Sequence, residues 1–431
     1  MMKSTLLWLL RRISEKVIKK YHPEIVGITG SIGKTSTKET VAAVLSSKFR
    51  VRANYKNYNN EIDLPLTVIG VPKSPGRSVL GWAKVFITGL GLLFATKKNY
   101  PEILVLEMGA DKPGDIKYLV GIAPCRVGVL TFISHAHTEF FKTIKRIAQE
   151  KRIILSHLPE DGTAVFNFDN PLVVENSGVT KAEKLSYGFK EGADFRATDV
   201  NILYGEDGFA PSGLNFKVNH KGSIVPVFMP DFISTAIIPA ALAALAVGSV
   251  YGINLVDGAE ALKKLLPLPG HMRPVKGVKG TLIIDDTYNS SPDAAKNALE
   301  VFAGLNKSDQ ARRFAALGDM LELGSETEHT HREIGFKVAE LGIDFLITVG
   351  EASKHTAIAA KEAGLAEDSV ASFSNSAEAG RFLQEKIKSG DRLLVKGSQG
   401  SRMEKIVKEL MAEPLEAPKL LVRQDPYWLA R

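Results

Sequence analysis

Short apolar runs alternate with amphipathic segments along most of the chain. Apolar runs of strand length stand at residues 24–29, 103–106 and 126–132, and again at 281–285, 313–317, 345–349 and 392–395. Segments with helical spacing lie between them, for example 38–47, 115–122 and 142–158. Strands separated by helices are typical of parallel, doubly wound sheets. The pattern therefore predicts an α/β fold.

Two stretches interrupt this alternation. Residues 161–230 hold short strand-like runs with turn signals, and Pro and Gly cluster at 267–274. We therefore expect a basic amphipathic helix at 1–21, a central α/β domain at 22–270 with a β-rich insertion, and a C-terminal domain at 271–431. The C-terminal domain is expected to be Rossmann-like but without the dinucleotide fingerprint.

The first segment has apolar residues at helical spacing and a basic polar side. Leu6, Leu10, Ile13, Val17 and Tyr21 form the apolar side. The apolar part is too short for a signal peptide or a spanning helix. Two interpretations stay open: a helix docked on the following domain, or an interfacial membrane helix.

Two further apolar segments need an interpretation. Residues 79–95 are interrupted by Lys84 and three glycines, so we do not expect a membrane span. A buried helix is the main interpretation, with membrane contact or a hydrophobic lid as alternatives. Residues 233–250 are rich in Ala and are expected to form a core helix.

Charge and cysteine content narrow the possible partners. Residues 1–56 hold 12 of the 55 Lys and Arg but only 3 of the 48 Asp and Glu, so the basicity is local. A phosphorylated substrate or an anionic membrane surface suits this asymmetry. Nucleic-acid binding is not expected, because no basic module interleaved with aromatic residues is present. The single cysteine, Cys125, excludes an internal disulfide and indicates a reducing compartment.

A glycine-rich turn follows the first strand-like run. Residues 27–40 read GITGSIGKTSTKET, which differs from the general phosphate-loop pattern in having Ile28 in place of Gly. Glycines let the backbone approach phosphate oxygens, a lysine reaches the terminal phosphates, and a hydroxyl faces Mg²⁺. We predict a nucleotide-binding loop made by Gly30, Ser31, Gly33, Lys34, Thr35 and Ser36.

Candidate metal ligands lie at the ends of the next strands. Glu107 ends a predicted parallel strand, where such sheets bind their ligands, and is expected to hold Mg²⁺. His137 lies past the following strand and could bind a second cation or hydrogen-bond its loop. His135 is the competing candidate, and spacing does not separate them. Lys151, on the next helix, resembles a surface lysine by its position alone.

Further polar clusters offer candidate substrate contacts. Asn59 and Asn60 stand in a turn close after the phosphate-loop helix. Asp286 and Asn289 end the first strand of the C-terminal domain, where an Asp could bind ribose and an Asn an adenine edge. Residues 396–400 read KGSQG, a glycine turn opening a helix, which is either a second anion site or a plain loop.

Together these motifs resemble the Mur ligases. The motifs, in order, are TGSIGKTSTKE, NNEIDLPLTV, LEMGADKPGDI, HAHTEFF followed by IAQEK, IIDDTYNSSPDAA, ALGDMLELG and LLVKGSQGSRME. They span residues 24–412. Within the family, the resemblance is closest to the branch that adds D-alanyl-D-alanine to the UDP-muramoyl tripeptide of peptidoglycan precursors.

The resemblance implies a reaction and roles for these residues. ATP phosphorylates a carboxylate, and an incoming amine attacks the acyl phosphate, with Mg²⁺ neutralising charge. Lys34 would contact the β- and γ-phosphates, Thr35 and Glu107 the first Mg²⁺, and His137 the second. Lys151 matches a lysine that becomes a carbamate and supports that metal. The remaining implied contacts are Asp286, Asn289 and Arg273 with the nucleotide, and Asn59, Asn60, Lys396 and Ser398 with the substrates.

The chain also departs from the family pattern. Only about 21 residues precede the first strand, where the family has a UDP-binding domain. Gly270-His271-Met272 stands where the family has Gly-Arg-Met, and Arg273 is the candidate replacement.

The resemblance leaves three functional hypotheses. The first is the D-alanyl-D-alanine-adding ligase of cell-wall synthesis. The second is a sibling ligase that adds another amino acid or dipeptide to a different carboxylate. The third is a degenerate ATP-binding scaffold, which predicts loss of key residues, yet Lys34, Thr35, Glu107, His137 and Lys151 are all present. We expect a monomer acting on small molecules in the cytoplasm, with possible contact at the inner face of the membrane.

Overall fold

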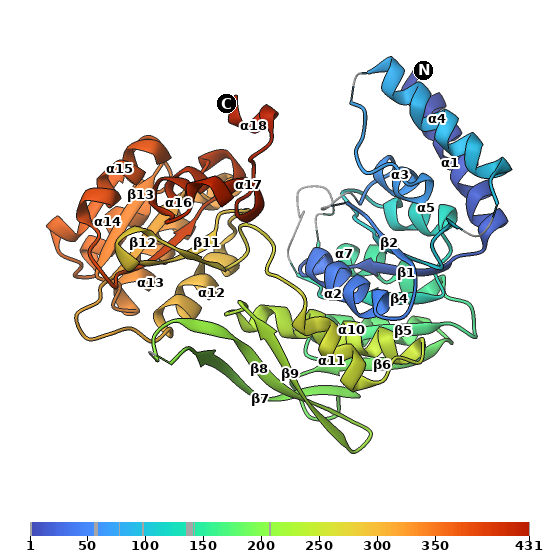
Figure 1. The fold of residues 1–431 in the computed structure, drawn as a ribbon, viewed down its shortest axis with the longest axis horizontal. Helices are drawn as coiled ribbons and strands as arrows, with labels where there is room; N and C mark the ends of the chain where they lie inside the picture. The colour runs from blue at the N-terminus through green and yellow to red at the C-terminus, as the bar shows by residue number, and fades with distance from the viewer. Residues whose placement is uncertain are drawn as a thin grey trace. The chain divides into compact units, whose positions relative to one another are not determined.

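The computed structural model describes residues 2–55, 59–76, 78–96, 99–134, 141, 143–206 and 208–430 (Figure 1). The chain forms two compact units. Unit 1 comprises Met1–Val200, Asn215–Phe228 and Thr235–Leu265. Unit 2 comprises Asn201–Leu214, Met229–Ser234 and Leu266–Arg431.

The larger sheet has its strands in the order β2-β3-β1-β4-β5-β6-β7-β8-β9. Every pair from β2 to β7 is parallel. The chain runs from β1 through β2 to β3 on one side, then crosses to β4 on the other side of β1. This reversal makes the carboxyl end of β1 a switch point, where open α/β sheets bind ligands. The strands are β1 (Glu24–Thr29), β2 (Val51–Ala53), β3 (Ile103–Glu107), β4 (Val127–Leu130), β5 (Thr163–Asn167), β6 (Glu183–Gly188), β7 (Phe195–Tyr204), β8 (Pro211–His220) and β9 (Ser223–Pro230).

Helices cover both faces of the parallel part of this sheet. Ile25 and Leu104 join a core cluster with residues of α1, α3 and α5. The alternate residues Val26 and Ile28 are buried but lie outside that cluster, because successive side chains point to opposite faces. The helices are α1 (Met2–Tyr21), α2 (Lys34–Ser46), α3 (Asp63–Ile69), α4 (Val79–Phe94), α5 (Asp115–Ile122), α7 (Ile144–Lys151), α8 (Ile153–Ser156), α9 (Pro171–Asn176), α10 (Ile238–Val250) and α11 (Leu255–Lys263).

The N-terminal helix α1 docks on unit 1. Leu10, Ile13 and Val17 are buried and belong to the same core cluster as Ile25. The docked-helix interpretation is therefore confirmed, although its other side is exposed. No helix among the residues described in the structure is long and apolar enough to cross a membrane.

Helix α4 differs from the buried helix that its composition predicts. Only Val85 and Gly89 are buried among its residues, and several of its large apolar side chains face solvent. The reason is tertiary: α1 and α3 pack against one side of α4. By contrast, α10 is buried along most of its length, as expected for a core helix.

Unit 2 contains the second sheet, in the order β10-β11-β15-β12-β13-β14. Only β10 is antiparallel to its neighbour, and the other pairs are parallel. Ile283 and Ile284, neighbours on β11, join two separate core clusters, so helices cover both faces. The strands are β10 (Arg273–Lys276), β11 (Leu282–Asp286), β12 (Arg313–Gly318), β13 (Phe345–Val349), β14 (Val370–Phe373) and β15 (Arg392–Lys396), and the helices are α12 (Pro292–Ala303), α13 (Thr327–Glu340), α14 (Lys354–Glu362), α15 (Ser376–Lys386), α16 (Glu404–Leu410), α17 (Ala417–Leu420) and α18 (Pro426–Leu429).

The predicted α/β fold with a Rossmann-like C-terminal part is confirmed. The expected strands appear with shifts of at most two residues at their ends. Two details differ from the sequence-based expectation. Part of the predicted β-rich insertion, β5 and β6, belongs to the parallel sheet. The single helix expected at 142–158 is two helices, α7 and α8, which meet at Arg152.

Candidate active site

The phosphate loop joins the end of β1 to the start of α2. Gly33, the N-cap of α2, has φ 82 and carries no side chain to cap the helix, so its first N–H groups face outward. A Cβ at Gly30 would lie 1.9 Å from Thr131 Oγ1. Thr131 Oγ1 in turn donates to the Ile32 carbonyl oxygen at 2.7 Å, which ties the loop to the end of β4. A helix N-terminus of this kind binds anions.

Lys34 folds back over this loop. Its ammonium donates to the carbonyl oxygens of Gly30 at 2.9 Å and Ser31 at 3.3 Å. Burial lowers the pKa of Lys34 from its usual value, and the negative charges of Glu107 and Asp111 oppose part of that shift. A positive charge therefore lies directly beside the anion site made by the start of α2.

Glu107, the last residue of β3, is held at both carboxylate oxygens. Oε2 accepts from Thr35 Oγ1 at 2.9 Å, and Oε1 accepts from Asn59 Nδ2 at 2.9 Å. The backbone N–H of Glu107 donates to Asn54 Oδ1 at 2.6 Å. These contacts fix the carboxylate beside the Thr35 hydroxyl, with only 1% of the residue exposed.

The Thr35 and Glu107 oxygens suit Mg²⁺. Among the residues that the structure describes, no three His, Cys, Asp or Glu side chains gather as a metal site. Mg²⁺ does not require such a group, because it prefers oxygen ligands and is held by one or two protein oxygens together with phosphates and water. The donor set fits a nucleotide-bound Mg²⁺ rather than a closed structural site.

Lys151, at the end of α7, is buried rather than on the surface, so its interpretation as a surface lysine is wrong. Burial lowers its pKa to about 7, the positive charge of Lys34 adds to that shift, and the carboxylates of Glu150 and Asp111 oppose it. Glu150 accepts hydrogen bonds from the Gly114 and Ile116 N–H groups, both at 2.8 Å. These bonds hold α7 against the start of α5 and so position Lys151.

Sequence spacing alone gave no sign of the role of Glu150. Its partners lie 34 and 36 residues earlier in the chain, and a Glu on an amphipathic helix is normally a surface residue. The role of Asn54 was missed for the same reason.

Other predicted residues near the loop have different outcomes. His137 and its competitor His135 lie outside the described residues. Asn60 Oδ1 accepts from the N–H groups of Ile62 at 2.9 Å and Asp63 at 3.1 Å, so this oxygen supports the start of α3. Ser31 Oγ accepts from the Ser134 N–H at 3.1 Å, which joins the phosphate loop to the segment after β4.

In unit 2, Asp286 and Lys396 form an ion pair at the carboxyl ends of β11 and β15. The two residues are register partners, and Lys396 Nζ lies 2.6 Å from Asp286 Oδ2. Lys396 Nζ also donates to the Asn289 carbonyl oxygen at 3.0 Å, and Asp286 Oδ1 accepts from the Met272 N–H at 3.1 Å. The structure thus places Asp286, predicted to contact the nucleotide, next to Lys396, predicted to contact the substrate. Asn289 is exposed.

Ser398 is fixed by two hydrogen bonds. Its hydroxyl accepts from the Leu321 N–H at 3.0 Å and donates to the Ser290 carbonyl oxygen at 3.3 Å. The neighbouring Met320 N–H donates to Nε2 of the buried His331 at 3.0 Å, and burial lowers the pKa of this histidine. Met320 and Leu321 lie in the ALGDMLELG motif. The sequence shows this motif but does not predict its contact with Ser398.

His271 and Arg273 flank the start of β10. The His271 ring stacks on Tyr288 with centroids 4.6 Å apart, and its Nδ1 is 2.9 Å from the Pro269 carbonyl oxygen. Burial lowers the pKa of His271, so the ring is neutral at pH 7. Arg273 pairs in register with Asp285, at the edge of the sheet.

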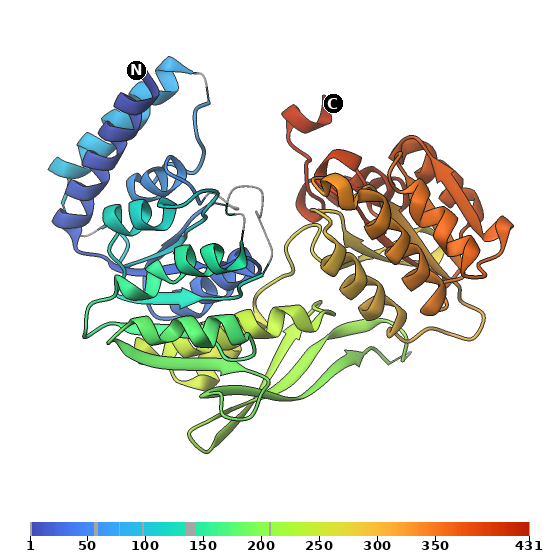
Figure 2. The same ribbon diagram turned by 180° about the vertical axis from the view of Figure 1, so that it is seen from behind.

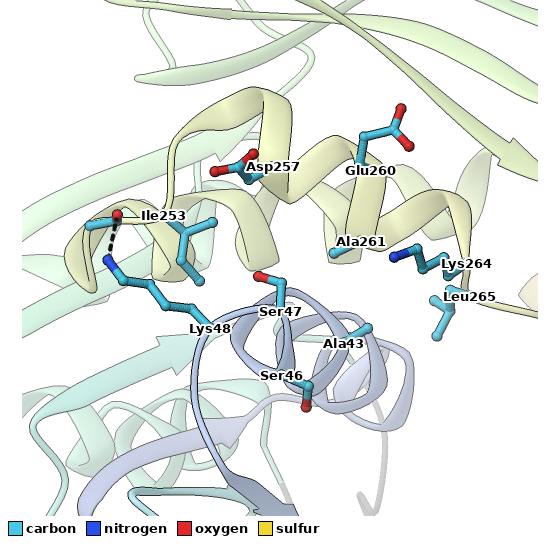
Figure 3. Close-up of a pocket in the computed structure, with 11 residues that line it drawn as sticks. Ala43, Ser46, Ser47, Lys48, Ile253, Asp257, Glu260, Ala261, Lys264 and Leu265 are labelled. Carbon is cyan, nitrogen blue, oxygen red and sulfur yellow. Dashed lines mark hydrogen bonds between the residues drawn. The ribbon is translucent and has the colours of Figure 1, made fainter.

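A cavity of about 680 Å³ lies elsewhere in unit 1, between the carboxyl end of α2 and helix α11 (Figure 3). Ser46, Ser47, Asp257 and Glu260 are among its lining residues, and Lys48 Nζ donates to the Gly252 carbonyl oxygen at 3.1 Å. Since α2 has 13 residues, this end is about 18 Å from Lys34. The cavity is therefore separate from the phosphate loop, and its mixed charges indicate no particular ligand.

Comparison with known proteins identifies the family. The profile of the Mur ligase middle domain matches residues 28–79 and 87–247, and that of the Mur ligase glutamate ligase domain matches residues 270–399. The UDP-N-acetylmuramoyl-tripeptide–D-alanyl-D-alanine ligase of Bacillus subtilis is 29% identical over 406 residues, which are 94% of this chain and 80% of that protein. The protein of the same name from Escherichia coli is 28% identical over 391 residues, or 90% of this chain and 76% of that protein.

Solved structures show the same fold. The MurF ligase from Thermotoga maritima in complex with ADP has a TM-score of 0.75 at 27% identity, covering 96% of this chain and 84% of that chain. A MurF structure from Acinetobacter baumannii has a TM-score of 0.77 at 25% identity, covering 96% and 81%. The two domain profiles of one family match this chain in sequence order. Their matched residues include the phosphate loop and the parallel strands described above. The chain therefore belongs to the Mur ligase family.

Proposed function

We propose that this chain is an ATP-dependent amide ligase of cell-wall synthesis that adds D-alanyl-D-alanine to a UDP-muramoyl tripeptide. The observation that best supports the proposal is the hydrogen-bonded pair of Thr35 and Glu107 beside the phosphate loop. Similar proteins are named for this activity. The γ-phosphoryl group of ATP passes to the peptide carboxylate, giving an acyl phosphate and ADP. The amine of the dipeptide then attacks the carbonyl carbon, and phosphate leaves as the amide forms.

The residues of the phosphate loop supply the electrostatics of the first step. Gly30, Ser31, Gly33 and Ser36 surround the nucleotide phosphates with main-chain and hydroxyl groups, and Lys34 contacts the β- and γ-phosphates. Thr35 and Glu107 would hold Mg²⁺, which would supply positive charge to neutralise the transferring group. The side-chain oxygens of these two residues lie 2.9 Å apart and share a hydrogen bond.

Lys151 is proposed to carry a carbamate that supports a second metal ion together with His137. Carbamate formation joins the uncharged amine to CO₂ and releases a proton. A pKa of about 7 leaves a large fraction of the Lys151 amine uncharged at neutral pH, whereas an ordinary lysine has almost none.

The residues of unit 2 are proposed to bind the adenosine part and the incoming amine. Asp286, Asn289 and Arg273 would contact the nucleotide, and Lys396 and Ser398 the amino substrate, with Asn59 and Asn60 on the substrate side of unit 1. Since Asp286 and Lys396 are paired, a ligand that uses either one meets both charges. We keep 22–270 and 271–431 as the proposed central and C-terminal domains.

Phosphate release identifies the substrates. Purified protein is incubated with ATP, Mg²⁺ and UDP-muramoyl tripeptide, with D-Ala-D-Ala or with single D- and L-amino acids. Turnover that depends on D-Ala-D-Ala is expected. Turnover only with another amine or carboxylate would instead assign the chain as a sibling ligase, and no turnover with any pair would leave the scaffold hypothesis.

A matched pair of lysine variants separates chemistry from general damage. Lys151→Ala is expected to abolish turnover, whereas Lys145→Ala, an exposed lysine on the same helix α7, is expected to leave it unchanged. Lys34→Ala is also expected to abolish turnover. Near-normal activity of Lys34→Ala would contradict the assignment of the phosphate loop.

We place the reaction in the cytoplasm, because it consumes ATP and because one unpaired, buried Cys125 suits a reducing compartment. The proposed partners are small molecules, without nucleic acid, and the proposed state is a monomer. Peripheral membrane contact has separate support in helices α1 and α4.

A further inference from the structure

Helix α4 exposes an apolar stripe to solvent. Val85 and Gly89 face the unit, whereas Leu80, Ile87 and Phe94 are 84%, 70% and 89% exposed. The last three are spaced by seven residues, so they lie on one side of the helix. Ordinary surface helices turn polar residues outward, and contiguous exposed apolar groups of this kind mark interaction sites.

Helix α1 adds a basic, aromatic side to the same region. Trp8 is 55% exposed, and the guanidinium of Arg12 lies 5.8 Å from the centroid of its ring. Arg12, Lys16 and Lys19 are exposed at helical spacing. Trp together with Lys or Arg is the residue combination enriched where helices lie at a membrane–water interface.

The two helices form one rigid feature. Figures 1 and 2 both show α1 and α4 side by side. Lys20 Nζ donates to the main-chain oxygens at the end of α4, those of Leu92 at 2.9 Å, Leu93 at 2.8 Å and Ala95 at 2.6 Å. Tyr21 donates its hydroxyl proton to the Leu92 oxygen at 2.7 Å. We name the exposed large apolar and basic residues of this helix pair the α1–α4 surface: Trp8, Leu9, Arg12, Lys16, Lys19, Val79, Leu80, Lys84, Ile87, Leu90 and Phe94.

The net charge of this region is positive. No Asp or Glu stands between Asp63 and Glu102 in the sequence, a stretch that contains all of α4. In α1 the acidic residue Glu15 pairs with Arg11 at 2.7 Å and with Arg12 at 3.4 Å. The α1–α4 surface therefore offers apolar side chains together with a net positive charge, carried by Lys16, Lys19 and Lys84.

We propose that the α1–α4 surface binds the surface of an anionic lipid bilayer. Apolar side chains that enter the acyl boundary, flanked by basic residues that attract anionic headgroups, are the two requirements for peripheral helices. A second copy of the chain fits less well, because a two-fold contact would place the same basic residues against one another. The proposal does not depend on the ligase reaction, since it uses residues outside the phosphate loop.

Vesicle sedimentation tests the proposal directly. Full-length protein is mixed with vesicles of phosphatidylcholine alone or of phosphatidylcholine with phosphatidylglycerol, and the pelleted fraction is measured at low and high salt. We expect pelleting with the anionic vesicles that decreases as salt rises, because exposed charges are screened. Equal pelleting with both lipids would overturn the anionic part of the proposal.

Variants at exposed positions locate the contact without threatening the fold. Leu80→Ser/Ile87→Ser/Phe94→Ser is expected to reduce the partition coefficient by about tenfold or more. Lys16→Ser/Lys19→Ser is expected to reduce it by roughly 25-fold on anionic vesicles, at about fivefold for each basic residue near an anionic surface. The matched control is Leu415→Ser, which removes a side chain that is 93% exposed in unit 2 and should change nothing.

Two results would overturn the proposal. The first is unchanged pelleting of both multiple variants, since then the α1–α4 surface does not carry the binding. The second is a stable dimer in light scattering without lipid that the triple serine variant dissociates, since then a second copy occupies this surface. ATP-dependent turnover of each variant in lipid-free buffer shows that the catalytic fold is retained.

Discussion

Replacing Lys396 with Met should destabilise unit 2 strongly, because it leaves a mostly buried carboxylate without its cation. The Lys396 and Asp286 side chains are 3% and 13% exposed, and their charged atoms lie 2.6 Å apart. In Lys396→Met the Asp286 carboxylate keeps one hydrogen bond, from the Met272 N–H, and little water. Removing one partner of a buried pair costs about 3–5 kcal/mol, so we expect a loss of that size.

The reciprocal change should cost less. In Asp286→Asn the lysine keeps its bond to the Asn289 carbonyl oxygen, and the new amide oxygen can still accept from Lys396. We expect a loss of about 1–3 kcal/mol. In Lys396→Met/Asp286→Asn no unpaired charge remains, so the two losses should not add, and the coupling energy should be about 2 kcal/mol.

Urea unfolding followed by Trp428 fluorescence measures these losses in unit 2. Trp428 lies in unit 2, where Arg402 donates to its carbonyl oxygen at 3.0 Å, so Trp8→Phe/Trp82→Phe leaves a reporter for that unit. The midpoint and slope give the free energy of unfolding for each variant. A loss below about 1 kcal/mol for Lys396→Met, or additive losses, would refute the reasoning that the pair is buried and coupled.

Three further changes test other parts of the molecule. Glu107→Gln should retain the fold but weaken Mg²⁺-dependent turnover by about 100-fold, seen in a Mg²⁺ titration of phosphate release. Gly30→Ala should lower the free energy of unfolding in urea by about 2–5 kcal/mol, because the added Cβ would meet Thr131. Gly33→Ala should lower it by only about 1–2 kcal/mol, because the added Cβ meets nothing within 4 Å and only the positive φ is unfavourable. Equal losses would contradict the packing of the loop. Burial lowers the pKa of His331 below 6.5, so as the pH falls the unfolded state binds a proton before the folded state does. The contribution of His331 to stability is therefore full above pH 6.5 and should decrease as the pH drops below that value. His331→Gln should show a weaker pH dependence when unfolding is compared at pH 7.5 and 5.5.

The sequence predicted the parts of the site that depend on local order. A strand, two glycines, Lys34, Thr35 and a helix follow one another within a few residues, so their geometry is set by short-range rules. Glu107 could be placed because parallel strands end at one edge of a sheet. Lys151 could not be placed in this way, because its burial depends on Glu150 reaching residues more than 30 positions away.

Helix α4 shows the same limit in the opposite direction. Its composition predicts burial, yet burial needs a partner on each side, and α1 and α3 cover only one. The pairing of Asp286 with Lys396 was also outside the reach of the sequence. Each residue looked like an independent ligand contact, and only the strand order β11-β15 makes them neighbours.

The position of Lys34 has a consequence for how the loop behaves before any nucleotide arrives. Its ammonium already bridges the carbonyl oxygens of Gly30 and Ser31, so the free loop is internally braced. An arriving phosphate must replace those two neutral acceptors with charged oxygens, and breaking each bond to the ammonium costs about 1.5–3 kcal/mol. Because the loop is ordered before binding, nucleotide binding should be fast and should cost little conformational entropy of the loop. In the free protein, Lys34 thus holds the loop in the conformation that binds phosphate.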